Sequence, residues 1–376
     1  MGTKSALKHE REPFFLASAA NRGNNSYSIV RIISAILVVF THSYSVVLGM
    51  ETKEPLRELT GYSLGSHAVH IFFTLSGFMI AASWERSRSL FDFVLARVLR
   101  IMPALICVCL AIVILSGLLL TKAAPGEYWT VRNIGTFLAK SLLIFSSDTR
   151  LAGVFGNNPS PGEINAAIWT IRYEVICYAS MMVFMLLIGL LRLGANARRL
   201  LLLGILGVSA TLLLLPEFTA HSPLASRMVR LVFAFYIGIL AWFERDRVRL
   251  ALPYLIAIWV LWAISVQFNS VLKLPLVIIA TGYLSFWLGS FRAGSLQEAA
   301  DRTDLSYGIY VSGFFIQQCL IQMFPHQGIF SNAVSAVLLS ALVAWFSWNW
   351  VERPALQLRV RAQRPHPLEK PAPAHA

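Results

Sequence analysis

The stretch YSIVRIISAILVVFTHSYSVVLG, residues 27–49, indicates the class of fold to expect. It is almost wholly apolar and long enough to cross a bilayer, since a spanning helix needs about 20 residues. Two ionisable residues, Arg31 and His42, lie within it. Lipid does not solvate such groups, so they usually face a protein interior and mark function. At roughly 100° per residue they share one helix face, about 16 Å apart along the axis.

Both residues also have a purely structural interpretation. Arg31 lies near the start of the span, where its long side chain can reach the lipid headgroups. His42 lies deeper, where a buried imidazole often does no more than donate a hydrogen bond to a carbonyl group. From this stretch alone, both the structural and the functional interpretation stay open for each residue.

The composition places the whole chain in a membrane. Of its 376 residues 56% are hydrophobic and only 14% are charged, which excludes an ordinary soluble domain. The net charge of +13 would suit nucleic acid, but in a membrane protein the location of Lys and Arg matters more than their sum. We therefore expect membrane lipid, and no nucleic acid, as a partner. The sequence contains no P-loop, dinucleotide fingerprint or zinc motif.

Ten apolar segments predict ten transmembrane helices and thus an all-α polytopic membrane helical bundle. They are residues 28–48, 68–84, 101–121, 165–191, 200–216, 229–243, 250–266, 271–290, 305–323 and 332–351. With the N-terminus inside, 21 Lys and Arg fall in cytoplasmic segments and nine in external ones. This bias predicts that both termini are cytoplasmic.

Three regions follow from this topology. We expect a cytoplasmic N-terminal tail over 1–26, a membrane domain over 27–356 and a Pro-rich, disordered cytoplasmic tail over 357–376. The long connection 122–164 is external in this topology and contains an apolar patch from Ile134 to Phe145. The patch predicts either a helix lying on the surface or a partial re-entrant segment.

The second span is followed by a pair of arginines. Within the span, Ser76 and Gly77 are small, which favours close helix approach or the passage of a ligand. Arg97 and Arg100 come three residues apart at the cytoplasmic surface and suit the binding of a phosphorylated ligand. The alternative is that the positive-inside rule alone places arginines there.

The fourth span carries a buried carboxylate in the sequence WTIRYE, residues 169–174. Glu174 lies about 14 Å along the helix from the external side, at a depth similar to that of His42. A carboxylate at that depth can orient an imidazole base. The alternative is a structural charge pair between Arg172 and Glu174, although residues two apart point away from each other on a helix.

Taken together, these residues resemble the acyltransferase-3 family of integral membrane acyltransferases. The matching features occur in the family's order and span nearly the whole chain, so the ordered set is specific although each piece alone is weak. They are Arg31 with His42, FFTLSGF at 72–78, Arg97 and Arg100 before IMP, WTIRYE at 169–174, SYGIY at 306–310 and VERP at 351–354.

The resemblance implies transfer of an acyl group, most often acetyl from acetyl-CoA, to a hydroxyl of an extracytoplasmic carbohydrate such as exopolysaccharide or O-antigen. It implies that His42 is catalytic, that Arg31 assists the donor and that Arg97 and Arg100 form the family's cytoplasmic arginine motif. One departure is Gly313, which stands where many members have a histidine.

The expected protein is a bacterial inner-membrane O-acyltransferase with acyl-CoA as donor substrate and with no bound cofactor or metal. The expected acceptor is an extracytoplasmic or lipid-linked carbohydrate, that is, a cell-surface glycan or its lipid-linked precursor. The expected catalytic residues are His42 and Glu174, and the expected donor-binding residues are Arg31, Arg97 and Arg100. Supporting roles are expected for Ser76, Gly77, Trp169, Arg172, Tyr310 and Glu352.

A different class of protein is the main alternative. In a polytopic transporter or flippase, the intramembrane Arg, His and Glu would form a proton relay. An inverted repeat or helices broken at matching positions would favour it, and the sequence shows neither. A non-catalytic membrane partner of a polysaccharide polymerase would leave the Arg31 to His42 spacing unexplained.

Overall fold

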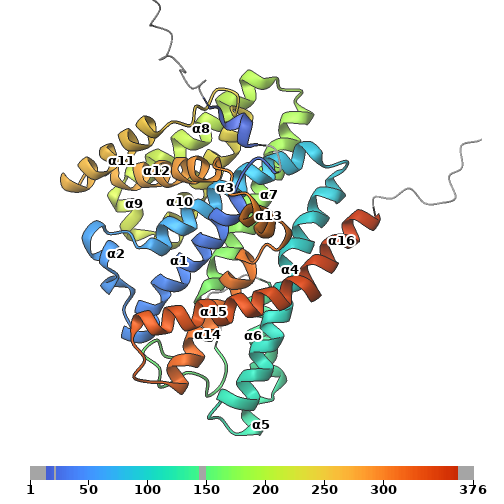
Figure 1. The fold of residues 1–376 in the computed structure, drawn as a ribbon, viewed down its shortest axis with the longest axis vertical. Helices are drawn as coiled ribbons and strands as arrows, with labels where there is room; N and C mark the ends of the chain where they lie inside the picture. The colour runs from blue at the N-terminus through green and yellow to red at the C-terminus, as the bar shows by residue number, and fades with distance from the viewer. Residues whose placement is uncertain (1–13, 21–22, 144–149, 363–376) are drawn as a thin grey trace, which may run out of the picture. The chain divides into compact units, whose positions relative to one another are not determined.

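The computed structural model describes residues 14–20, 23–143 and 150–362, and within these ranges the chain is built of helices (Figure 1). An isolated β-bridge between Phe15 and Arg249 is the only strand-like pairing recorded in them. The all-α prediction is confirmed. The α-helices are α1 (Tyr27–Leu48), α2 (Pro55–Thr60), α3 (Leu64–Arg86), α4 (Leu90–Leu115), α5 (Pro125–Tyr128), α6 (Val131–Leu142), α7 (Trp169–Leu190), α8 (Ala195–Leu214), α9 (Pro216–His221), α10 (Pro223–Phe243), α11 (Leu252–Gln267), α12 (Lys273–Gly289), α13 (Ser295–Arg302), α14 (Ser306–Met323), α15 (Ile329–Ser347) and α16 (Arg353–Ala362).

Each of the ten predicted spans falls on a helix. By length and composition, seven helical segments of the described chain are able to cross a membrane, and α11 and α12 are apolar but shorter. The seven are Tyr27–Leu48, Leu64–Arg86, Leu90–Leu120, Ala166–Leu190, Ala195–Leu214, Pro223–Phe243 and Ile329–Arg359. A multi-pass helical bundle is therefore confirmed, whereas the count of ten and the cytoplasmic side of both termini stay predictions.

The chain forms two compact units. Unit 1 comprises Met1–His42, Glu51–Ala82 and Thr170–Ser306, and unit 2 comprises Ser43–Met50, Ser83–Trp169 and Tyr307–Ala376. Helices α1, α3, α7 and α14 contribute residues to both units. Each unit is described separately below.

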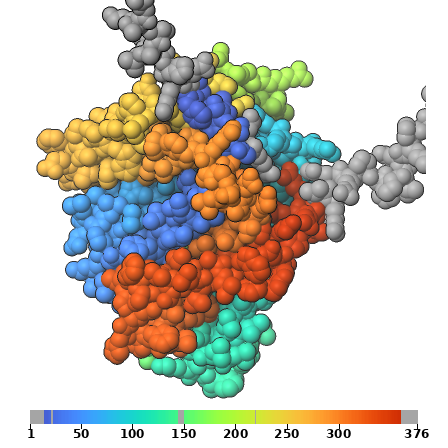
Figure 2. All heavy atoms as spheres, viewed as in Figure 1, coloured from blue at the N-terminus to red at the C-terminus, as the bar shows by residue number. Residues whose placement is uncertain are grey.

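In unit 1, α10 packs against α8 and α12, and α12 packs against α11. The side chains of α11 and α12 form one continuous surface in Figure 2. Two glycines, one on α3 and one on α10, allow these two helices to approach closely. A Cβ atom at Gly77 would lie 1.9 Å from the carbonyl oxygen of Phe235, and one at Gly238 would lie 2.0 Å from that of Thr74. This is the close helix approach that small residues favour.

Aromatic packing around Phe78 completes the interior of unit 1. Phe78 is 2% exposed. Its ring centroid lies 5.7 Å from that of Tyr27, 5.2 Å from Trp242 and 5.3 Å from Phe286. One ring of α3 thus contacts α1, α10 and α12. The distances are those of ordinary aromatic pairs, which stabilise a core beyond their buried area.

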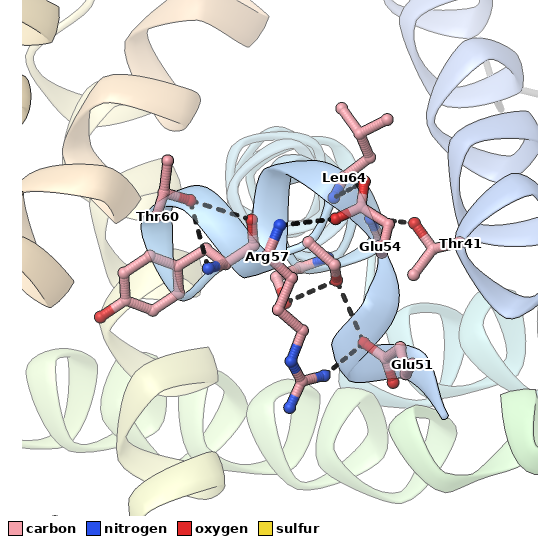
Figure 3. A network of polar contacts seen from close by, with 10 residues as sticks. Thr41, Glu51, Glu54, Arg57, Thr60 and Leu64 are labelled. Atoms are coloured by element: carbon pink, nitrogen blue, oxygen red, sulfur yellow. Dashed lines mark hydrogen bonds and ion pairs between the residues drawn. The ribbon is translucent and has the colours of Figure 1, made fainter. Parts of the chain in front are cut away.

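The connection between α1 and α3 is held by a local polar network, also in unit 1 (Figure 3). Glu54 is the N-cap of α2 and accepts a hydrogen bond from the Arg57 backbone N–H at 2.7 Å. The Arg57 guanidinium in turn pairs with Glu51 at 2.7 Å. The Gly65 N–H donates to the Thr41 hydroxyl at 2.8 Å. The start of α3 is therefore fixed against the C-terminal part of α1.

In unit 2, the sequence fixes the start of α4. The Ser89 side chain accepts a hydrogen bond from the Asp92 N–H at 3.1 Å, as N-cap serines do. Asp92 also binds the Arg359 guanidinium at 2.8 and 3.0 Å, which ties α4 to α16. Helix α16 continues through Ala362, so helical structure extends into the tail that was predicted to be disordered from residue 357.

The apolar patch in the connection 122–164 forms a helix. Helix α6 covers Val131–Leu142, and it packs against α4. Its start is capped by Thr130, which accepts a hydrogen bond from the Asn133 N–H at 3.2 Å. The predicted patch ended at Phe145, which lies outside the described residues.

Candidate active site

Arg31 pairs with an acidic residue inside unit 1. Its Nη1 atom lies 2.8 Å from Asp304 Oδ2, and the two side chains are only 18% and 13% exposed. Asp304 Oδ1 accepts hydrogen bonds from the Ser306 N–H at 3.2 Å and the Ser306 hydroxyl at 2.6 Å. One carboxylate therefore caps the start of α14 and holds the guanidinium of α1. The side chain of Arg31 is directed into the protein.

His42 lies half-buried on α1, one residue after Thr41. The Thr41 hydroxyl accepts the Gly65 N–H, which anchors this turn of α1 to the start of α3. Glu51, in the polar network of Figure 3, is within electrostatic range of His42. The continuous helix Tyr27–Leu48 carries both Arg31 and His42, as the sequence predicts.

Glu174 is held by two hydroxyl groups. The Ser76 hydroxyl donates to Glu174 Oε1 at 3.3 Å, and the Tyr178 hydroxyl donates to the same oxygen. The carboxylate thus connects α3 to two successive turns of α7. Its described hydrogen bonds go to these hydroxyls, and the orientation of His42 by Glu174 stays a prediction. Tyr178 was missed in the sequence, although an i, i+4 spacing after Glu174 places it on the same face.

Arg172 and Glu174 point to different partners. Arg172 Nη2 donates to the Tyr173 hydroxyl at 2.8 Å, and its guanidinium carbon lies 4.6 Å from the centre of that ring. Within the described chain, the alternative of an Arg172–Glu174 charge pair is therefore not formed. Two residues apart, the side chains leave a regular helix in different directions.

Arg100 is the centre of a second polar group, in unit 2. Its Nη1 atom lies 3.5 Å from Glu352 Oε2, and Glu352 is 1% exposed. The Ser347 hydroxyl donates to the other oxygen of Glu352 at 3.1 Å. The rings of Tyr307 and Trp348 lie 5.9 and 6.0 Å from the guanidinium carbon. The guanidinium of Arg100 thus contacts one carboxylate and two aromatic rings.

A π-helical turn over Trp348–Glu352 helps to build this group. Such turns widen an α-helix locally and are frequent at functional sites. Here the turn carries both Trp348 and Glu352, which contact the same guanidinium. A prediction from helical periodicity assumes a regular α-helix. It therefore did not indicate that Trp348 and Glu352 contact the same guanidinium.

Arg97 lies on α4 one turn before Arg100. Its Nη2 atom donates to the Ser83 hydroxyl at 3.2 Å, and the residue is half-buried. The two arginines therefore share a helix and have different partners. Arg97 is held by Ser83 of α3 and Arg100 by Glu352 of the π-helical turn, and both side chains are half-buried.

The remaining predicted residues lie where α7 begins and within α14. Trp169 is the first residue of α7 and is half-buried, and Tyr310 is 9% exposed. Sequence reasoning missed two fully buried amides of α14. Gln318 donates to the carbonyl oxygens of Ser160 and Glu163 at 2.8 and 2.9 Å, so it holds the long connection. The sequence did contain a signal for this role, because two adjacent glutamines stand inside an apolar span.

The predicted site residues are divided between the two units. Unit 1 holds Arg31, His42, Ser76, Gly77, Arg172 and Glu174, and unit 2 holds Arg97, Arg100, Trp169, Tyr310 and Glu352. The structure joins Ser76 to Glu174 in the first unit and Arg100 to Glu352 in the second.

A family model described as an acyltransferase domain matches residues 24–349. The chain belongs to the acyltransferase-3 family. The resemblance inferred from the ordered motifs is thereby confirmed, and so is the prediction that the protein is an acyltransferase. As a family member with several apolar helices, it is a multi-pass membrane protein.

Two curated proteins are similar to this acyltransferase along nearly their whole length. An O-acetyl transferase of Shigella phage Sf6 is 25% identical over 341 residues, which cover 88% of this chain and 95% of that protein. Nodulation protein 10 of Rhizobium leguminosarum bv. viciae is 25% identical over 361 residues, which cover 89% and 94%. No solved structure matches the chain. The family and its O-acetyl transferase relative support membrane O-acyltransferase activity.

Proposed function

We propose that the protein is a bacterial inner-membrane O-acyltransferase that moves an acyl group, acetyl in the first instance, from acyl-CoA to a hydroxyl of a cell-surface glycan. The observation that carries this proposal is the family match over residues 24–349. The similarity to a phage O-acetyl transferase supports acetyl as the group and oxygen as the accepting atom. Exopolysaccharide and O-antigen are the acceptor classes that we propose.

The proposed binding of the acyl-CoA donor depends on the arginines of α4. CoA carries several phosphates, and guanidinium groups bind phosphate through paired, charge-assisted hydrogen bonds. Arg100 is fixed by Glu352, Trp348 and Tyr307, so it loses little side-chain freedom when it binds a ligand. Arg97, one turn away, supplies a second positive charge. Arg31 assists the donor in this proposal, with its guanidinium positioned by Asp304.

The proposed activation of the acceptor hydroxyl depends on His42 as general base. The imidazole takes the proton of the acceptor hydroxyl while that oxygen attacks the thioester carbon. A C–O bond forms, the C–S bond breaks, and the imidazolium returns the proton to the sulfur of CoA. A positioned general base contributes about 10²–10⁴-fold to such a step. Glu174 supports this chemistry electrostatically, from the place where Ser76 and Tyr178 hold it.

The glycan itself provides the test. Surface glycan from a deletion strain is compared with wild type by mass spectrometry and by the O-acetyl signals in NMR spectra. We expect acyl groups to be lost, to return with the wild-type gene, and to stay absent with His42→Ala. A deletion strain with unchanged surface acylation would contradict the proposed acceptor class.

The alternative of a transporter or flippase gives a different result in the same strains. A defective flippase would deplete the whole glycan from the surface, whereas a defective acyltransferase leaves the glycan present and unmodified. Normal glycan amount with missing acyl groups therefore favours the enzyme.

A further inference from the structure

A cavity of about 260 Å³ lies between the start of α8 and the end of α10, within unit 1. Three arginines, Arg198, Arg199 and Arg247, line it together with the carboxylates of Glu244 and Asp246. The proposed acyl transfer uses none of these residues. A cavity with an excess of positive charge is suited to binding an anion.

Arg198 is held in place by an aromatic ring. Its guanidinium carbon lies 3.8 Å from the centre of the Phe243 ring, and both residues are half-buried. Such stacking fixes the direction of an arginine side chain without using its N–H groups. In the described part of the chain, this guanidinium has no carboxylate and no hydrogen-bond partner. Its planar set of donors is therefore available to a ligand.

The other two arginines share one carboxylate. Arg247 Nη1 lies 2.7 Å from Glu244 Oε2, and Arg199 Nε lies 3.5 Å from Glu244 Oε1. The single negative charge of Glu244 therefore positions two guanidinium groups and cannot neutralise both. Asp246, the other lining carboxylate, is exposed to solvent, which screens its charge.

The backbone around the cavity adds positive charge and rigidity. Helix α8 begins here with Gly194 as N-cap, which makes no side-chain hydrogen bond, and its first turn contains no acidic residue. The positive end of the helix dipole thus adds to the arginines. The loop after α10 is fixed by the N-terminal segment, because the Leu16 and Ala17 N–H groups donate to the carbonyls of Val248 and Arg245 at 2.9 and 3.0 Å. Little ordering is left for a ligand to impose.

The surroundings of the cavity indicate where the anion comes from. In the predicted topology, 192–199 and 245–249 are cytoplasmic, and the span 200–216 begins directly after Arg199. Leu200, Leu201 and Leu203 of that span are exposed, so they offer an apolar surface to acyl chains. Basic pockets at the cytoplasmic ends of membrane helices suit the headgroups of anionic lipids.

We propose that Arg198, Arg199 and Arg247 bind the phosphate of an anionic membrane phospholipid, whose acyl chains lie against the exposed leucines of α8. Guanidinium groups bind phosphate through paired, charge-assisted hydrogen bonds. A zwitterionic lipid has the same phosphate but also a cation, which the three arginines repel. The site therefore distinguishes lipids by net charge. This inference goes beyond the proposed function and does not depend on it.

Photo-crosslinking tests the inference. The probes are phosphatidylglycerol and phosphatidylcholine with the same acyl chain, which carries a diazirine close to the headgroup. Each is added in trace amount to nanodiscs of unlabelled phosphatidylcholine that contain the full chain, and labelled peptides are quantified by mass spectrometry. We expect phosphatidylglycerol to label residues 200–203 at least about five-fold more than phosphatidylcholine, which is the contribution of one arginine near a membrane surface.

An internal reference is available in the same unit. Ile256 and Val260 of α11 are exposed in the span 250–266, which also begins on the cytoplasmic side of the predicted topology. Neither residue lines the cavity. We expect the two lipids to label this segment equally.

Arg198→Gln should lower the ratio of labelling at 200–203 to that of the reference segment. Arg198→Lys should keep part of the preference, since it keeps the charge without the planar fork. The matched control is Arg192→Gln, which removes an exposed arginine of the same connection that does not line the cavity. This control should keep the full preference.

Equal labelling of residues 200–203 by the two lipids in the wild type would overturn the inference, and so would a preference that survives Arg198→Gln. Should Arg198→Gln fail to insert, the wild-type ratio and its partial loss in Arg198→Lys still decide. Competitors identify the source of the phosphate. Loss of the preference with acetyl-CoA, or with inorganic phosphate but not with sodium chloride of equal ionic strength, would assign the cavity to a soluble phosphate compound and overturn the inference.

Discussion

Arg31 of α1 and Asp304, two residues before the start of α14, form an ion pair of 2.8 Å although they are 273 positions apart in the chain. Asp304 also accepts hydrogen bonds from Ser306, so one carboxylate has a charge role and a capping role. The two roles are separable by mutation.

Asp304→Asn should keep the cap, because its side-chain oxygen still accepts from the Ser306 N–H, but it loses the charge. We expect it to destabilise the protein by about 1.5–3 kcal/mol, the range of a hydrogen bond to a charged group. Asp304→Ala should cost about 1 kcal/mol more, because the cap is lost as well. Unfolding of both variants in detergent measures the difference. Equal stability of the asparagine and alanine variants would argue against a capping role.

Arg100→Gln should destabilise the protein and weaken donor binding, because it removes the ion pair that Arg100 makes with the buried carboxylate of Glu352. The double variant with Glu352→Gln should recover stability, since no charge is left buried. It should not recover acyl-CoA affinity, which we expect to fall by roughly one to two decades. Titration of acyl-CoA in nanodiscs is the measurement. Full donor affinity in the double variant would limit Arg100 to a structural role.

Arg97→Gln should reduce acyl-CoA affinity with a smaller effect on folding. Its Nη2 atom donates to the neutral Ser83 hydroxyl, and losing a bond of that kind costs less than losing the contact of Arg100 with a buried carboxylate. Arg97→Lys should recover part of the affinity because it keeps the charge and loses the planar fork. An affinity that is unchanged in Arg97→Gln would assign this arginine to membrane topology alone.

His42→Ala should leave the protein folded and lower acyl transfer by about 10²–10⁴-fold. Removing a proton-transfer group changes rate more than packing. The matched control is His326→Ala, which removes an exposed histidine and should leave the rate unchanged. The measurement is transfer from labelled acetyl-CoA by equal amounts of inserted protein. A well-expressed His42→Ala variant with wild-type activity would rule out the assignment.

Gly77→Ala should be strongly destabilising, because its Cβ atom would lie 1.9 Å from the Phe235 carbonyl oxygen. Overpacking of this kind costs at least about 1–3 kcal/mol. Gly204→Ala on α8 is the control, since nothing lies within 4 Å of the position of its Cβ atom. Expression level and unfolding in detergent compare the two. Equal behaviour would contradict the close contact of α3 and α10.

The predicted topology is tested with single cysteines in a variant without the four native ones. Cysteines at Lys53 and Pro159 should react with an impermeant thiol reagent in intact cells, and one at Arg198 should not. Labelling at Arg198 would contradict the arrangement of ten spans with both termini cytoplasmic.

The helices and the placement of polar residues along them are local properties of the chain, so they could be predicted from the sequence. Apolar runs of span length can only form helices in lipid, because every backbone polar group must be satisfied within the segment. Caps such as Ser89 with Asp92 are local, so their pattern is readable. The Arg31 to His42 spacing on α1 is likewise a property of one helix, and the ordered motifs indicated the family.

Which polar groups contact one another depends on how distant helices pack, so these contacts are known from the folded chain alone. Helical periodicity gives the direction of a side chain on its own helix, and it carries no information about a partner from a distant segment. From equal depth the sequence predicted that Glu174 orients His42, which stays a prediction, and it did not predict the hydrogen bonds that Glu174 accepts from Ser76 and Tyr178. Arg31 with Asp304 and Arg100 with Glu352 became neighbours through helix packing, 273 and 252 positions apart in the chain.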